Sequence, residues 1–341
     1  MALTAVFPLI IILISACTPR TQAIASTLPT KAAVATIPAT ATPTASPLPS
    51  PTLRPTATAY PSPTATATPL PTATITPSPT PTPIPIGEQI NGVHIDDFAI
   101  LSPAVQTHVR EIYALGQEMG RNSQAVSKLG DSSMASPNYL VRVGQYDFDL
   151  GEYAFLQETI DEYQISFRRL GPSAIVGLHA TSVFSPDLIN PAMCDVEEDE
   201  NMLDCEFRLH NPSIMIIALG TNDEHELFQE RMGKIVEYSM ERGVIPVLVT
   251  KADRYEGEDN RNNISIRALA AQYDVPLLDF DLLADTLPNR GLGHDDVHLT
   301  EYAYYEYASP QAFESGYSIL NLSTMMMLDV LRDITQEGGA N

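Results

Sequence analysis

Five short apolar runs, separated by longer segments, constrain the fold more than any other feature of the sequence. The runs cover residues 125–130 (AVSKLG), 173–177 (SAIVG), 213–220 (SIMIIALG), 244–250 (VIPVLVT) and 275–280 (VPLLDF). Two segments between them, 225–243 and 264–273, have apolar residues at helical spacing. Strands buried on both faces give continuous apolar runs, and alternation with helices favours parallel crossovers. We therefore expect an α/β fold, a three-layer sandwich around a flavodoxin-like, doubly wound parallel sheet of about five strands.

The first 86 residues differ in charge from the rest of the chain. They contain no Asp or Glu and only three basic residues, so residues 87–341 carry all 42 acidic side chains against 16 basic ones. That segment is long enough to bury one large core as a single domain. Its acidic surface disfavours nucleic acid and anionic lipid as partners, because both would be repelled.

The N-terminus has the pattern of an export signal. The run AVFPLIIILISA is about 12 residues long, too short to span a bilayer but typical of the apolar region of a secretory signal. It ends in Ile14-Ser15-Ala16-Cys17, which resembles a bacterial lipobox. We expect residues 1–17 to be a signal peptide, with Cys17 lipidated on a membrane-anchored protein at the bacterial cell surface. The alternative is a plain cleaved signal followed by an unrelated cysteine.

Residues 18–86 consist mainly of Pro, Thr, Ala and Ser, and 17 of the 28 prolines fall there. Dense proline removes backbone donors, and the scarcity of large apolar side chains leaves little to offset the entropy of ordering. We expect this segment to be a disordered stalk that holds the following domain away from a membrane. Its hydroxyl groups also permit O-glycosylation.

Cys194 and Cys205 are the two cysteines that follow Cys17. In an oxidising compartment, a pair at this spacing is expected to form one local disulfide. The acidic run between them, 195–200 (DVEEDE), is either a solvated loop or a calcium site. Metal binding by the two cysteines would need more ligands, and we expect neither a metal nor a cofactor.

Ligands of doubly wound folds bind beyond the carboxyl ends of the strands, so the residues that follow each apolar run are candidates for chemistry. The last candidate lies in GLGHDDVHLT, where an aspartate precedes a histidine by three positions. We expect these groups to meet at one edge of the sheet. They are Gly130-Asp131-Ser132, Gly177, Gly220-Thr221-Asn222-Asp223 and the pair Asp295 and His298.

The motifs GDSS, an isolated glycine, GTND and DDVH resemble, in order and interval, the four blocks of the SGNH hydrolases, also called the GDSL esterase/lipase family. The resemblance extends over residues 90–335. It implies the SGNH hydrolase fold and hydrolysis of carboxylic esters by a serine without a cofactor. Inspection finds no GxSxG, HExxH, GxxxxGK[ST] or GxGxxG motif in the sequence.

The resemblance also implies a role for each matching residue. Ser132 would be the nucleophile, His298 its general base, and Asp295 the acid that orients the imidazole. The Ser132 and Gly177 backbone N–H groups and the Asn222 side-chain amide would form the oxyanion hole. A glycine suits that place because a missing Cβ lets substrate approach the backbone.

Two of these assignments have a competitor in the sequence. Asp296 follows Asp295 directly and is a second possible partner for His298, although the spacing favours Asp295. Gly171 is a weaker alternative to Gly177, which we prefer for its place at the end of the second apolar run.

Each motif also has a structural explanation that involves no catalysis. Ser132 and Ser133 could cap a following helix, and the segment 221–223 could merely form a turn. His294 and His298, four positions apart beside two aspartates, could be metal ligands.

The substrate is less constrained by the sequence. The segment 300–318 carries several tyrosines, and we hypothesise that it lines the substrate pocket, with Tyr304 and Tyr305 in contact with an acyl or sugar group. Packing of this segment against the sheet is the alternative. A tethered domain would meet surface or environmental polysaccharides, which suggests their O-acetyl groups as substrate. The other functions considered are a non-catalytic glycan-binding module and an acyltransferase; the oligomeric state is left open.

Overall fold

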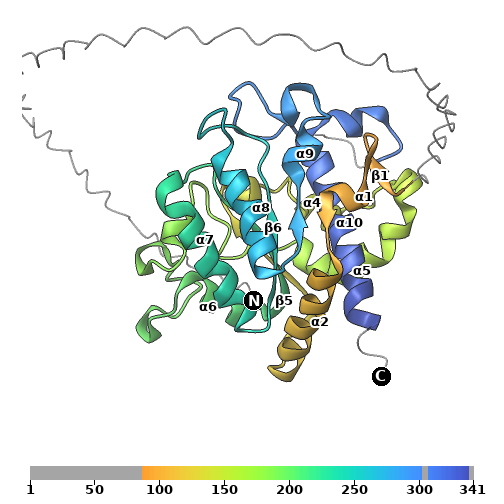
Figure 1. The fold of residues 1–341 in the computed structure, drawn as a ribbon. Coiled ribbons are helices and arrows are strands. Elements are labelled where there is room, and N and C mark those ends of the chain that lie inside the picture. Colours follow the sequence, from red (N-terminus) through yellow and green to blue (C-terminus); the bar gives the residue numbers. More distant parts are fainter. Residues whose placement is uncertain (1–86, 302–305, 338–341) are drawn as a thin grey trace, which may run out of the picture. The chain divides into compact units, whose positions relative to one another are not determined.

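The structure of the chain is a computed structural model that describes residues 87–301 and 306–337 (Figure 1). Its centre is a five-stranded sheet of order β3-β7-β6-β5-β4. Strands β4 to β7 are parallel, and β3 pairs antiparallel with β7 at one edge. The predicted α/β class and doubly wound sheet are therefore confirmed. The strands are β3 (Ala99–Ile100), β4 (Asn122–Gly130), β5 (Pro212–Ala218), β6 (Ile245–Val249) and β7 (Leu277–Leu278).

Helices cover both faces of this sheet (Figure 1). Along β5, Ile214 and Ile216 belong to one buried cluster, whereas Met215 and Ile217 belong to the other. Alternate side chains therefore enter separate cores, which explains why the strand sequence is apolar throughout. The first core is shared with α2 (Pro103–Glu118), α5 (Gln157–Phe167), α9 (Phe280–Ala284) and α10 (Gly316–Glu337), and the second with α6 (Met202–His210), α7 (His225–Met240) and α8 (Arg261–Tyr273).

Local signals set where several helices begin and end. The Ser102 side chain accepts a hydrogen bond from the Val105 backbone N–H at 3.3 Å, and Pro103 fits the first helical position of α2. After α7, Gly243 has a φ of +65°, as expected for the glycine that ends this helix. A Cβ on Gly243 would lie 2.3 Å from the Gly116 Cα atom, so a small residue is also needed where this turn meets α2.

The second apolar run does not form the predicted strand. Only Ala174 bridges to β4, through hydrogen bonds on either side between Gly130 and residues 173 and 175. Val176 is 73% exposed, and the chain then turns at Gly177, whose φ is +76°. The run is too short and too exposed to extend the sheet. It does lie beside β4, where a second strand of a flavodoxin-like order belongs.

The remaining described elements are short. No helix among residues 87–301 and 306–337 is long and apolar enough to cross a membrane. The predicted signal peptide, Cys17 and the stalk lie outside the described residues. The short elements are β1 (Gln89–Ile90), β2 (Val93–His94), α1 (Ile95–Phe98), α3 (Ser132–Ala135), α4 (Val141–Gln145), and the 3-10 turns η1 (Gly151–Leu156), η2 (Ala180–Ser182), η3 (Pro186–Leu188), η4 (Val196–Glu198), η5 (Pro288–Gly291) and η6 (Pro310–Glu314).

Candidate active site

Ser132 is the first residue of α3, directly beyond the carboxyl end of β4. The cap of this short helix is Asp131, whose carboxylate accepts a hydrogen bond from the Ser133 backbone N–H at 3.2 Å. The interpretation of Ser132 and Ser133 as caps is therefore wrong. A Cβ on Gly130 would lie 2.3 Å from Met134 Cγ, so the turn before the serine requires a glycine for close packing.

His298 and Asp295 form a hydrogen-bonded pair on one loop. The His298 Nδ1 atom lies 2.7 Å from Asp295 Oδ2. The other carboxylate oxygen accepts from the His298 backbone N–H at 3.0 Å and the Val297 N–H at 3.2 Å. These hydrogen bonds hold the pKa of Asp295 well below its usual range, and the one with the His298 side chain has the largest effect. A carboxylate kept ionised beside Nδ1 favours the tautomer that leaves the Nε2 lone pair free to accept a proton.

Asp296 is engaged elsewhere. Its carboxylate accepts a hydrogen bond from the Asn289 side-chain amide at 3.1 Å, and its backbone has a φ of +56°. The contact to the imidazole thus comes from Asp295, the acid favoured by the spacing.

Asn222 lies in the turn after β5 and points toward the Ser132 turn. Its Nδ2 atom makes a long 3.5 Å contact with Asp131 Oδ2. The next residue, Asp223, is buried and accepts a hydrogen bond from the Ala180 backbone N–H at 2.8 Å. Burial raises the pKa of Asp223. Asp223 therefore ties the turn that carries Asn222 to the segment that follows Gly177.

Gly177 is exposed, and no atom lies within 4 Å of the position that its Cβ would occupy. Its positive φ also favours glycine on conformational grounds. Gly171, the alternative candidate, would place a Cβ 2.3 Å from the buried Glu206 carboxylate. Gly171 is thus required for packing, whereas the space beside Gly177 is open.

One small cavity, of about 30 Å³, brings the candidate motifs together at the carboxyl edge of the sheet. Its lining includes the direct neighbours of three predicted residues. Asp131 and Ser133 flank Ser132, Thr221 precedes Asn222, and Val297 and Leu299 flank His298.

Two consecutive asparagines that sequence reasoning missed hold the site turns from α8. The Asn262 side chain donates to the Gly220 carbonyl at 2.7 Å and to the Asp223 carbonyl at 3.2 Å. The Asn263 side chain exchanges two 2.8 Å hydrogen bonds with the Lys251 backbone. One helix end therefore fixes the turns after β5 and β6. The signal in the sequence was a pair of asparagines near the start of a helix, with nothing to indicate which backbone they reach.

Arg290 anchors the loop that carries His298. It precedes this loop and donates from Nε to the Ala252 carbonyl at 2.7 Å, in the segment after β6. It also pairs with Asp281 and Asp285 around α9. Arg290 thereby attaches the histidine loop to the segment after β6 and to α9.

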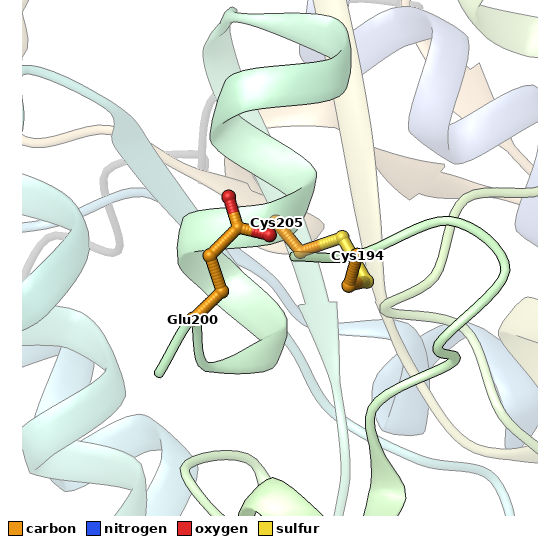
Figure 2. Close-up of side chains that lie close together, drawn as sticks. All are labelled: Cys194, Glu200 and Cys205. Atoms are coloured by element: carbon orange, nitrogen blue, oxygen red, sulfur yellow. A yellow bond between two sulfur atoms is a disulfide. The ribbon is translucent and has the colours of Figure 1, made fainter. Parts of the chain in front are cut away.

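Cys194 and Cys205 are joined by a disulfide, with Glu200 beside it (Figure 2). Within the described part of the chain, these three residues form the one group of potential metal ligands whose ligand atoms all lie within 4.8 Å of each other. Both sulfurs are in the disulfide, so neither is a thiolate ligand. Glu200 pairs with Arg208, and this hydrogen bond lowers its pKa. His294 and His298 are not part of any such group in the described residues.

Tyr304 and Tyr305, the two tyrosines predicted to contact the substrate, lie outside the described residues. Tyr307 is buried, donates to the Ser318 carbonyl at 2.9 Å, and packs near Tyr153 and Phe313. Tyr307 is therefore a core residue, as the packing alternative predicted for this segment.

No protein-family model matches the chain, and no curated protein matches it. Solved structures similar to it include a psychrotrophic esterase, EstA, from Pseudoalteromonas sp., with 14% identity over 63% of this chain and 96% of that chain, at a TM-score of 0.35. A putative lipolytic protein of the G-D-S-L family from Desulfitobacterium hafniense has 16% identity over 60% of this chain and 99% of that chain, at a TM-score of 0.38.

A further similar structure is a variant of an acetyl-xylooligosaccharide esterase from Geobacillus Stearmophilus, with 15% identity over 60% of this chain and 93% of that chain, at a TM-score of 0.37. Most aligned residues thus differ between this chain and each of these proteins. The roles of individual side chains therefore depend on the geometry of the chain itself.

Proposed function

We propose that the chain is a serine esterase that hydrolyses carboxylic esters. The observation that carries this proposal is the cavity whose lining includes the neighbours of Ser132, Asn222 and His298. The turns that carry the proposed nucleophile, base and amide donor meet at this cavity, and Asp295 Oδ2 lies 2.7 Å from Nδ1 of the proposed base.

In the proposed reaction, Ser132 Oγ attacks the acyl carbon while His298 Nε2 takes its proton. The Asn222 amide and the Ser132 and Gly177 N–H groups stabilise the oxyanion that forms. The alcohol then leaves with the proton from His298, and the acyl group remains on Ser132. Water attacks this acyl-enzyme, again giving its proton to His298, and the acid is released as serine is restored.

The proposed substrates are acylated carbohydrates, with O-acetyl groups of polysaccharides first. Support comes from the predicted lipid anchor at Cys17 and the proline-rich stalk, which would hold the domain near such polymers outside the cell. Incorporation of labelled fatty acid into the full chain, and its loss in Cys17→Ala, tests the anchor separately from the activity.

The test of the activity compares hydrolysis of p-nitrophenyl acetate and acetylated xylan by the purified chain and its variants. Ser132→Ala is expected to lower kcat roughly 10⁴-fold or more. Ser136→Ala, at the end of the same short helix and outside the cavity lining, is the matched control and is expected to stay within about threefold of the unmodified chain. Equal activity in Ser132→Ala and the unmodified chain would reject the nucleophile assignment.

A further inference from the structure

Two buried carboxyl groups lie at the base of the site, and the proposed reaction uses neither. Asp131 and Asp253 are 3% and 4% exposed. The Thr221 hydroxyl donates to Asp253 Oδ2 at 2.9 Å, and Thr221 directly precedes Asn222. All three residues line the cavity beside the proposed nucleophile.

Asp131 contacts both halves of the proposed machinery. One carboxyl oxygen accepts from the Ser133 N–H at 3.2 Å and so caps the helix that begins at Ser132. The other lies 3.5 Å from the Asn222 side-chain nitrogen. The position of this carboxyl therefore bears on the orientation of the nucleophile turn and of the oxyanion amide together.

Asp253, which accepts the hydrogen bond from the Thr221 hydroxyl, is held firmly. Its Oδ1 atom accepts from Lys251 Nζ at 2.9 Å and from the Tyr255 backbone N–H at 3.1 Å. Lys251 also pairs with Glu256, and its backbone is fixed by Asn263. Asp253 is thus a rigid, charge-compensated support.

The Thr221 hydroxyl has one proton to donate, and the hydrogen bond to Asp253 uses it. Burial raises the pKa of Asp131 to about 6, and the nearby charges of Asp253 and Asp223 act in the same direction. Tyr317 of α10 is the other titratable group that interacts with Asp131. Asp131 is therefore protonated more readily than an exposed aspartate.

We propose that Thr221 is a positioning residue for the ester hydrolysis proposed above. Its hydroxyl ties the turn that carries Asn222 to the fixed Asp253, and so holds the Asn222 amide in place beside Asp131, the cap of the helix that begins at Ser132. This inference rests on the proposed function.

Steady-state kinetics of the full chain with p-nitrophenyl acetate tests it. Thr221→Ala is expected to lower kcat about tenfold or more while KM stays within about twofold, because the effect is on orientation rather than on substrate contact. Thr221→Ser keeps the hydroxyl and is expected to restore kcat to within about threefold. Thr107→Ala, on the exposed side of α2, is the matched threonine control. Thr221→Val keeps the side-chain shape and serves if the alanine variant is unstable.

Full kcat in Thr221→Ala, an equal loss in Thr221→Ser, or failure of both Thr221→Ala and Thr221→Val to fold would overturn the inference. Ser132→Ala is measured beside them. An inactive Ser132→Ala with full kcat in Thr221→Ala rejects the positioning role alone. An active Ser132→Ala rejects the proposed function and the positioning role with it.

Discussion

The Asn289 side-chain amide donates to the Asp296 carboxylate at 3.1 Å, on the same loop in which Asp295 contacts His298 at 2.7 Å. The amide also lies 3.3 Å from the Gly293 carbonyl oxygen. Two adjacent acids therefore have different partners, and only Asp295 faces the imidazole.

Asparagine at these two positions is expected to have very different effects. Asp295→Asn should lower kcat for p-nitrophenyl acetate by roughly 10³- to 10⁴-fold, because a neutral amide no longer selects the tautomer of His298 that accepts a proton. Asp296→Asn should stay within about threefold, since the loop contact can be kept by an amide oxygen. A larger loss in the Asp296 variant would reverse the assignment.

Gly177 and Gly92 form a matched pair for testing the oxyanion assignment. Their φ values are +76° and +84°, and no atom lies within 4 Å of either Cβ position. Alanine at either site should lower the free energy of unfolding by about 1 kcal/mol, because of the left-handed backbone. Only Gly177→Ala should also lower kcat, by about tenfold, because its Cβ would occupy the space into which the ester approaches.

Urea unfolding measures the first effect and p-nitrophenyl acetate hydrolysis the second. Gly92 lies between β1 and β2, away from the cavity lining. A Gly177→Ala variant that loses stability like Gly92→Ala but keeps full kcat would remove Gly177 from the oxyanion hole.

The raised pKa of Asp131 predicts a definite pH dependence of stability. Its value in the folded chain, about 6, exceeds the ordinary 3.8, so its neutral form is favoured in the folded state. The stabilising contribution is fully present below pH of about 3.8 and is lost as the pH rises through about 6. Asp131→Asn stays neutral and does not lose it.

Urea unfolding at pH 4.5 and pH 8 tests this sign. The free energy of unfolding of Asp131→Asn minus that of the unmodified chain should be larger, by about 2 kcal/mol, at pH 8 than at pH 4.5. Costs of the substitution that do not depend on pH cancel in this comparison. A difference of zero, or one of opposite sign, would show that Asp131 is ionised without penalty in the folded chain.

The disulfide between Cys194 and Cys205 closes a short loop beside the start of α6. Replacing both cysteines by serine should lower the free energy of unfolding by about 3 kcal/mol, mainly because the unfolded loop gains conformational entropy. The kcat should stay within about twofold, since neither cysteine lines the cavity. Thermal unfolding with and without reductant gives the measurement, and the serine variant should be insensitive to reductant.

The central strands and the histidine pair could be predicted because their signals are local. Apolar runs such as 213–220 identify a buried strand directly, and a three-residue spacing allows Asp295 to reach His298. The run 173–177 does not form the predicted strand, because strand pairing depends on the segments that lie beside it in the fold. The chain turns at Gly177 after a single bridge to β4.

Hydrogen bonds between residues far apart in the sequence could not be predicted in the same way. Asn262 binds backbone more than 30 positions away, and no local pattern in the sequence specifies that partner. The tyrosines of 300–318 are predicted as a group to line the pocket, but the Tyr307 ring is buried against α10 and η1. Composition identified the aromatic cluster, but only tertiary packing decides which rings are inside.

The two asparagines of α8 make the turns after β5 and β6 a single unit for protein engineering. Lengthening or replacing one turn alone would leave a buried amide without its carbonyl partner, so substrate range is more readily altered through the segment around Gly177, where the surroundings are open. Redesign of the Asn222 turn calls for α8 to be rebuilt with it.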